Sequence, residues 1–234
     1  MHGLPHRQSA AQTGTPLRPH ACGGRRHLNS PAVELLFADE HLLVAVKPAG
    51  LLSVPGRGAD KQDCLSARLQ QQFPDSLVVH RLDMATSGLM LFARGPEMQR
   101  KLSMLFQHRE MDKRYIAVCT GKLENPRGEI DLPIAPDWPN RPLQRVDVEH
   151  GKPSLTRYQL LQQEGDHSRV ELEPVTGRTH QLRLHLSALG HPILGDALYG
   201  DEHSAPRLLL HACLLRFNHP ISVELLAFEH APSF

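Results

Sequence analysis

Short apolar runs separated by turn-forming residues fill most of the chain after residue 32. Residues 33–37 and 42–46 are two such runs, and Asp39 and Glu40 lie between them, which predicts a β-hairpin. Residues 127–174 indicate a series of short strands and turns. Further strands are expected at residues 89–93, 115–119, 208–217 and 223–228.

Three segments carry apolar residues three or four positions apart, which is the spacing of one helix face. They are residues 63–73, a segment opened by Pro96, and residues 179–189. Pro74 and Gly190 are expected to end the first and the third. The predicted core stripes are Leu65 and Leu69; Met98, Leu102, Leu105 and Phe106; and Leu182, Leu186 and Leu189.

The order of these elements indicates the fold class. Strands outnumber helices, and most connections are too short for the crossover that parallel strands require. No internal repeat is present in the sequence. We therefore expect an α+β fold with a mixed, mostly antiparallel sheet flanked by helices.

The first 30 residues differ from the rest in composition. They contain four arginines, no acidic residue and no aromatic residue, and they show no apolar period. We expect residues 1–30 to form a disordered basic arm and residues 31–234 to form one folded domain. Removing the four arginines from the 26 basic residues leaves 22 against 25 acidic ones, so any contact of this domain with nucleic acid needs a local basic patch.

Composition narrows the environment of the protein. No apolar run approaches the roughly 20 residues of a membrane span, and no secretory signal follows the N-terminus. The sixteen histidines form no recognisable metal-binding pattern. The cysteines are each more than 40 residues apart, which favours the reducing cytoplasm and argues against a zinc ribbon; they are Cys22, Cys64, Cys119 and Cys213. No membrane span and no metal site are expected.

Two polar clusters are candidates for chemistry. The first, His80-Arg81-Leu82-Asp83-Met84-Ala85-Thr86-Ser87-Gly88, lies between two apolar stretches. An aspartate in such a loop either serves a site or caps a turn. The second cluster, residues 175–185, begins a helix after a glycine turn. Arg183 lies there on the side away from Leu182, where it either pairs with a carboxylate or faces water.

These clusters carry a family resemblance. HRLDMATSG, GRTHQLRLHLSALGHPILGD and the KPAG loop together resemble the RluA family of pseudouridine synthases, over residues 33–234. The resemblance implies the pseudouridine synthase fold, with an active-site cleft across the sheet, and isomerisation of uridine in RNA without a cofactor. The stretches DLP, DWPNRP and LLSVPGR resemble more narrowly a dual-specificity branch. That branch implies two substrates, a hairpin loop of 23S-type rRNA and the tRNA anticodon loop.

The resemblance also implies roles for four residues. Asp83 matches the catalytic aspartate, acting either as a nucleophile at C1′ or as a base at C2′. Arg183 matches the arginine that pairs with it. Tyr115 matches the tyrosine that stacks on the flipped uracil, and Arg81 matches the residue that displaces the target nucleotide from the RNA.

Two rival functions and some departures accompany this interpretation. The rivals are a non-catalytic RNA-binding module of the same fold and a hydrolase built on Ser87, Asp83 and His80. Many family members carry an S4-type module, which about 30 residues cannot hold, so recognition is assigned to the domain's own cleft and loops. No obligatory protein partner is implied. Residues 196–207 form a turn-rich segment to which the sequence assigns no contacts.

Overall fold

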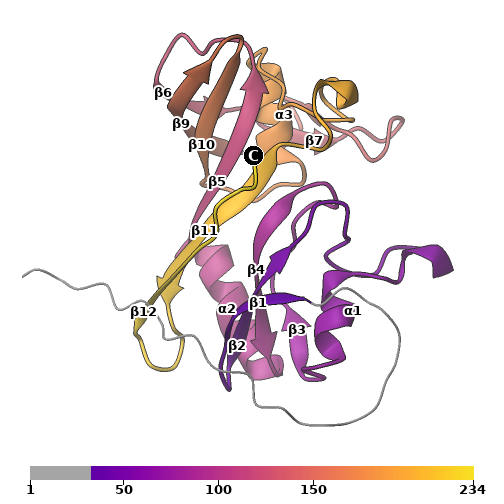
Figure 1. Cartoon of the computed structure of the whole chain (residues 1–234), viewed down its shortest axis with the longest axis vertical. Coiled ribbons are helices and arrows are strands. Elements are labelled where there is room, and N and C mark those ends of the chain that lie inside the picture. The colour runs from indigo at the N-terminus through magenta and orange to yellow at the C-terminus, as the bar shows by residue number, and fades with distance from the viewer. Residues whose placement is uncertain (1–32) are drawn as a thin grey trace, which may run out of the picture. The chain divides into compact units, whose positions relative to one another are not determined.

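The computed structural model describes residues 33–234, so the arm predicted over residues 1–30 lies outside the described part. Figure 1 shows the elements of this part. The helices are α1 (Leu65–Gln70), α2 (Pro96–His108) and α3 (Gln181–Ala188). The strands are β1 (Glu34–Ala38), β2 (Leu42–Lys47), β3 (Ser76–Val78), β4 (Ser87–Arg94), β5 (Asp112–Thr120), β6 (Arg127–Asp131), β7 (Ile134–Pro136), β8 (Gln144–Val146), β9 (Leu155–Glu164), β10 (His167–Pro174), β11 (Leu210–Asn218) and β12 (Leu225–Glu229).

One large sheet runs in the order β1-β2-β4-β11-β5-β10-β9-β6, with β3 beside β4 and β12 beside β11. Its neighbouring strands are antiparallel except for β4 and β11, which pair in parallel. β7 and β8 form a separate two-stranded sheet. The expected α+β fold with a mixed, mostly antiparallel sheet is therefore confirmed.

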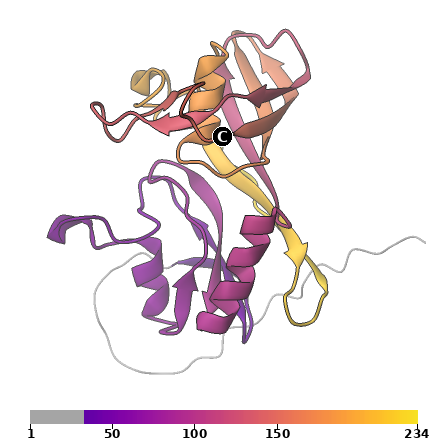
Figure 2. The same cartoon turned by 180° about the vertical axis from the view of Figure 1, so that it is seen from behind.

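Helices cover both faces of the sheet near β2 and β4. Alternate residues of β2 enter two different cores, Leu42 and Val44 with α2, and Leu43 and Ala45 with α1. Every residue of β2 is buried, so its sequence is a continuous apolar run rather than an alternating one. Figure 2 shows α2 along these strands, and α3 packs on the other half of the sheet, against β5 and β10.

The predicted helices form, with shorter ends. α2 begins with Pro96 and ends at His108; its C-cap, Arg109, adopts a left-handed conformation and donates its N–H to the Leu105 and Phe106 carbonyls. The helix expected over residues 63–73 is limited to Leu65–Gln70, with Cys64 as its N-cap. In the described part of the chain, no helix is long and apolar enough to cross a membrane.

Two expectations were wrong. Residues 127–174 do not hold only short strands, because β9 and β10 form a long hairpin that turns at Gly165 and Asp166. β9 faces water along much of its length, so it lacks the apolar alternation that would have marked it. The second wrong expectation is that Leu189 belongs to the core face of α3: it is 40% exposed and follows the last residue of the helix.

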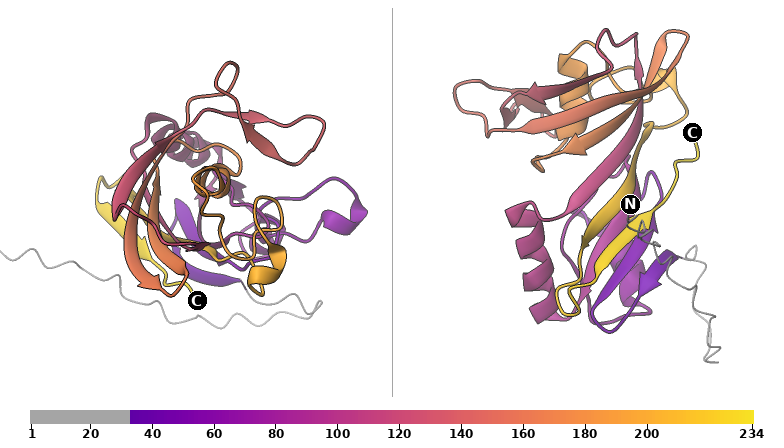
Figure 3. Two further views of the ribbon diagram at one scale, coloured as in Figure 1. Left: turned by 90° about the horizontal axis from the view of Figure 1, so that it is seen from above. Right: turned by 90° about the vertical axis from the view of Figure 1, so that its left-hand side faces the viewer.

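The register around β11 brings together segments that are distant in the sequence. Ala212 of β11 lies opposite Gly88 of β4 on one side and opposite Tyr115 of β5 on the other. A Cβ atom at Gly88 would lie 2.3 Å from the Ala212 carbonyl oxygen, so only glycine permits this approach. The loop before β4, which contains Asp83, is thereby placed beside Tyr115. The two further views in Figure 3 show β5 and β11 linking the two halves of the sheet.

Candidate active site

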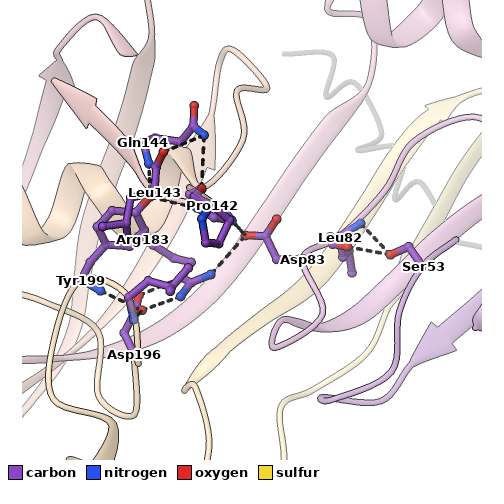
Figure 4. Close-up of polar contacts among 11 residues, drawn as sticks. Ser53, Leu82, Asp83, Pro142, Leu143, Gln144, Arg183, Asp196 and Tyr199 are labelled. Carbon is purple, nitrogen blue, oxygen red and sulfur yellow. Dashed lines mark hydrogen bonds and ion pairs between the residues drawn. The ribbon is translucent and has the colours of Figure 1, made fainter. Parts of the chain in front are cut away.

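The loop that carries Asp83 is fixed by hydrogen bonds from the segment that follows β2. Ser53 Oγ donates to the Leu82 carbonyl at 2.6 Å and accepts the Leu82 N–H at 3.1 Å. The Gly50 N–H and Lys47 Nζ both donate to the Met84 carbonyl, at 2.8 and 3.0 Å. The residues on either side of Asp83 are therefore held in place. Figure 4 shows the Ser53 contacts beside the Asp83 carboxylate.

Lys47, the last residue of the apolar strand β2, is completely buried although its side chain carries a charge. Its three donors are matched by three carbonyls, those of Pro48 at 2.9 Å, Leu51 at 2.7 Å and Met84 at 3.0 Å. Burial lowers the pKa of Lys47 to about 8, and the charge of Asp83 opposes this shift. The ammonium thus ties the KPAG segment to the Asp83 loop, a role that the sequence did not assign.

Arg183 contacts two carboxylates. Its Nη1 lies 3.5 Å from Asp83 Oδ2, so the predicted pair exists as an ion pair. A closer partner is Asp196, whose two oxygens accept hydrogen bonds from Nε, at 2.8 Å, and from Nη2. Asp196 also accepts the N–H groups of Leu198 and Tyr199. The sequence assigned no contacts to residues 196–207, yet this segment supplies Asp196, which orients the guanidinium (Figure 4).

Burial and charge pairing together set the pKa values of Arg183 and Asp196. Burial opposes the charged form of Arg183, but the hydrogen bonds and charge of Asp196 and the charge of Asp83 outweigh it and raise its pKa. Burial likewise opposes ionised Asp196, yet bonding to Arg183 keeps the Asp196 pKa below its usual value. Both groups are charged at neutral pH. Arg183 therefore does not face water, which was one of the two options left open by the sequence; it is 4% exposed.

His180 and Tyr199 complete the surroundings of the carboxylate. His180 adopts a left-handed conformation, φ 57°, at the start of α3, and this conformation turns its ring toward Asp83, with Nε2 at 3.9 Å from Oδ2. Its Nδ1 is 2.8 Å from the Tyr199 hydroxyl, which accepts the Gln144 N–H at 2.8 Å. Burial lowers the pKa of His180, which favours a neutral ring that accepts at Nδ1 and carries its proton at Nε2.

A cavity of about 290 Å³ opens in front of Asp83. Tyr115 is half-buried in its wall, and burial together with the charge of Asp83 raises the Tyr115 pKa, so the hydroxyl keeps its proton. Arg183 and His180 line the same cavity. Arg81 also lines it and is exposed. The structure thus brings together all four predicted site residues.

Two further hollows adjoin this cavity. One, of about 410 Å³, shares Asp83, Arg81 and Arg183 with it and reaches Pro142. The other, of about 770 Å³, shares Lys113 and Arg178 and extends to Arg109 and Arg216. Five basic residues line this hollow against three acidic ones, Glu110, Asp112 and Glu173, so a mainly basic path leads away from Asp83 along the ends of α2 and β10.

The hydrolase alternative is not supported by the geometry. Ser87 Oγ lies 2.8 Å from His211 Nδ1, and both side chains are buried. His80 Nε2 accepts the Leu91 N–H at 2.9 Å, and its ring stacks on Phe106. Ser87, Asp83 and His80 therefore form no relay, because each is engaged with a different partner.

Comparison with known proteins identifies the family. A family described as RNA pseudouridylate synthase matches residues 41–188, which include Asp83, Tyr115 and Arg183. The chain belongs to this family. A dual-specificity RNA pseudouridine synthase RluA from Vibrio cholerae is 50% identical over 195 residues, which cover 82% of this chain and 80% of the relative. The RluA of Escherichia coli is 45% identical over 208 residues, covering 87% and 95%.

Solved structures of pseudouridine synthases share the fold. Human RNA pseudouridylate synthase domain containing 1 superposes with a TM-score of 0.71 at 30% identity, covering 86% of this chain and 84% of the other. Human RNA pseudouridylate synthase domain containing 4 gives 0.70 at 26% identity, covering 86% and 89%. The expected pseudouridine synthase fold is therefore confirmed.

The residues that sequence reasoning missed are those that position this synthase site. Asp196, Tyr199, Lys47 and Ser53 all lie in stretches that the motifs quoted for the family include or adjoin. The ILGD that ends the second motif carries Asp196, and this match was the available signal for its role. No group of three His, Cys, Asp or Glu side chains in residues 33–234 is arranged to hold a metal ion.

Proposed function

We propose that this pseudouridine synthase converts loop uridines of two RNAs, a hairpin of 23S-type rRNA and the tRNA anticodon loop. The relatives from Vibrio cholerae and Escherichia coli carry the name dual-specificity RluA, and the chain covers most of their length. Recognition of a folded shape, with the target base splayed out, accommodates two different sequences. This proposal favours an enzyme over a non-catalytic module of the same fold.

The observation that carries the proposed chemistry is the fixed position of Asp83. Its carboxylate lies at the wall of a cavity of about 290 Å³, with Arg183 on one side and Tyr115 in the same lining. We assign Asp83 to attack C1′ or to remove the C2′ proton. In either route the bond from C1′ to N1 breaks, the uracil turns, C1′ bonds to C5, and the C5 proton leaves while N1 gains one. In the first route C5 displaces the ester that Asp83 forms at C1′, and in the second Asp83 returns the proton to C2′ when C1′ bonds to C5.

Arg183 and Tyr115 support that step in different ways. The guanidinium, held by Asp196, pairs with the Asp83 carboxylate and aims it at the sugar. Tyr115, protonated because its pKa is raised, offers a ring face to the uracil and a hydroxyl for proton transfer near C5. Arg81, exposed at the cavity mouth, takes the place of the displaced nucleotide in the RNA stack.

The basic path beside the site supports an RNA backbone as the ligand. Arg81, Lys113, Arg178 and Arg109 form no ion pair with another side chain within residues 33–234. Unpaired cations along one groove are suited to successive phosphates. The free thiols Cys64, Cys119 and Cys213 fit the reducing cytoplasm, where we place the enzyme.

Tritium release tests this function. RNA labelled at C5 of uridine is offered as an anticodon stem-loop and as an rRNA hairpin, and release of the label reports loss of the C5 proton. We expect release from both RNAs, and pseudouridine at one loop position in each. Release from neither RNA contradicts the proposed activity, and release from only one contradicts dual specificity.

A further inference from the structure

Trp138 is the only tryptophan of the chain, and it lies on the surface. It belongs to the loop of residues 137–143, which connects β7 and β8. The residue is 64% exposed, although indole is among the largest apolar groups available to bury.

The loop holds Trp138 in a defined position. The Asp137 N–H donates to the Leu143 carbonyl at 3.0 Å and closes the loop. The Asn140 backbone N–H donates to the Asp137 carbonyl at 3.1 Å, and the Asn140 side chain donates to the Asp137 carboxylate at 2.9 Å. The indole is therefore presented from an ordered turn, so little conformational entropy remains to be lost when a ligand binds.

Arg141 covers the indole from within the same loop. Its guanidinium carbon lies 3.3 Å from the ring centroid. Such a stack leaves the opposite ring face free for a second planar group, and it places a positive charge beside that group. A planar apolar surface with an adjacent cation matches a nucleobase and its phosphate.

The loop is joined directly to the active site. Pro142 lines the hollow of about 410 Å³ that also contains Asp83 and Arg81. At the base of the loop, the Gln144 N–H donates to the Tyr199 hydroxyl, which contacts His180. Figure 4 shows Pro142, Leu143 and Gln144 beside Arg183 and Asp83. The loop that carries Trp138 therefore also borders the hollow beside Asp83.

We propose that Trp138, backed by Arg141, is a stacking platform for a second unstacked base of the substrate RNA. This inference rests on the proposed function. The target uracil occupies the cavity lined by Tyr115, so the platform receives a neighbouring loop nucleotide. Stacking accepts any base, because every base has a flat face. The platform therefore holds an opened loop without demanding one sequence, which suits an enzyme with two RNA substrates.

The single tryptophan provides a direct measurement. Unlabelled anticodon stem-loop is added to the full-length protein while indole fluorescence and its quenching by acrylamide are followed. We expect the indole fluorescence of Trp138 to fall, and its quenching by acrylamide to decrease, as the RNA approaches saturation of the protein. The same stem closed as a loop-free duplex is the control, and it is expected to change neither. Abasic substitution of one loop nucleotide other than the target should restore the signal.

Variants separate stacking from other roles. Trp138→Ala is expected to raise KM about tenfold with a much smaller effect on kcat, whereas Trp138→Phe keeps a ring and stays near wild type. Ile221→Ala, which changes another exposed apolar residue in a loop, is the matched control. Circular dichroism spectra and melting temperatures verify that each variant folds.

Three outcomes overturn the inference. Trp138→Ala with an unchanged KM is one, and pseudouridine formation with unchanged indole signals is the second. The third is shielding of Trp138 that depends on protein concentration without RNA, which indicates a second copy of the chain as the partner. In all three cases wild-type turnover still supports the proposed function, whereas absence of turnover on both RNAs contradicts that function instead.

Discussion

Asp196 holds Arg183 through two parallel hydrogen bonds while being completely buried itself. Two backbone N–H groups, from Leu198 and Tyr199, fix the same carboxylate. The guanidinium that faces Asp83 is therefore in place before substrate binds. Electrostatic stabilisation of this kind costs no reorganisation during the reaction.

Replacing Asp83 separates chemistry from binding. Asp83→Asn is expected to abolish turnover while RNA affinity stays within about tenfold, because phosphate contacts elsewhere supply most of the affinity. Tritium release measures turnover, and filter binding measures affinity. Appreciable residual turnover would contradict the role assigned to the carboxylate.

Arg183→Lys keeps the charge but loses the planar fork that Asp196 and Asp83 share. We expect kcat to fall by about a hundredfold, since small displacements of a reacting group have effects of this size. Single-turnover kinetics at saturating RNA measure the change. Arg157→Lys, at an exposed ion pair with Glu129, is the control and should stay near wild type. A rate for Arg183→Lys close to that control would show that its orientation is not needed.

Lys47→Met is expected to destabilise the fold. It removes a donor from three carbonyls and leaves those of Pro48 and Leu51 without this partner, while the Met84 carbonyl keeps the Gly50 N–H. A loss on the order of 2–3 kcal/mol in the free energy of unfolding is expected. Urea unfolding measures it, with Lys101→Met as a surface control at an exposed helix pair. Equal stability of the two variants would refute the anchoring role of Lys47.

Stability is expected to fall in mild acid because of His211. This residue is 3% exposed, and burial together with the charge of His230 lowers its pKa to about 4 from 6.5. The unfolded chain therefore takes up a proton near pH 6.5 that the folded chain refuses until about pH 4. The contribution of neutral His211 to the free energy of unfolding is fully present above pH 6.5 and is lost as the pH falls toward 4.

At pH 5 we expect a loss on the order of 1–2 kcal/mol from His211. Urea unfolding at pH 7.5 and pH 5 measures the difference, and His211→Gln should reduce it. His150→Gln, at an exposed histidine, is the control and should leave it unchanged. If both variants lose as much stability in acid as the wild type does, another group is responsible.

The sequence predicted the residues to which we assign substrate contacts better than the residues that hold them in position. Asp83 and Arg183 lie in long motifs, so their pairing could be inferred from the family resemblance. The closer contact of Arg183 with Asp196 could not be inferred in this way, because Asp196 reaches Arg183 through a turn whose course depends on tertiary packing. A buried lysine such as Lys47 likewise contradicts the usual exposure of its residue type, and only its three carbonyl acceptors explain it.

The secondary structure likewise divides into elements that local spacing predicts and elements that depend on distant contacts. The β1–β2 hairpin and α2 follow from local apolar spacing, whereas the length of β9 does not, because water covers much of that strand. By its apolar spacing alone, α3 would present a polar face to water. Its polar residues Gln181 and His185 instead bond to Thr156 on β9, and this burial depends on contacts between distant segments.

The position of Ala212 between Gly88 and Tyr115 also bears on how the enzyme is made. The four residues assigned to catalysis and base displacement precede residue 184, so a ribosome has synthesised all of them well before β11 emerges. Until β11 docks, the strand that pairs with both β4 and β5 is missing, so the sheet does not yet place the Asp83 loop beside Tyr115. Activity therefore begins only after the last strands are translated, and incomplete chains carry every reactive group without an assembled centre.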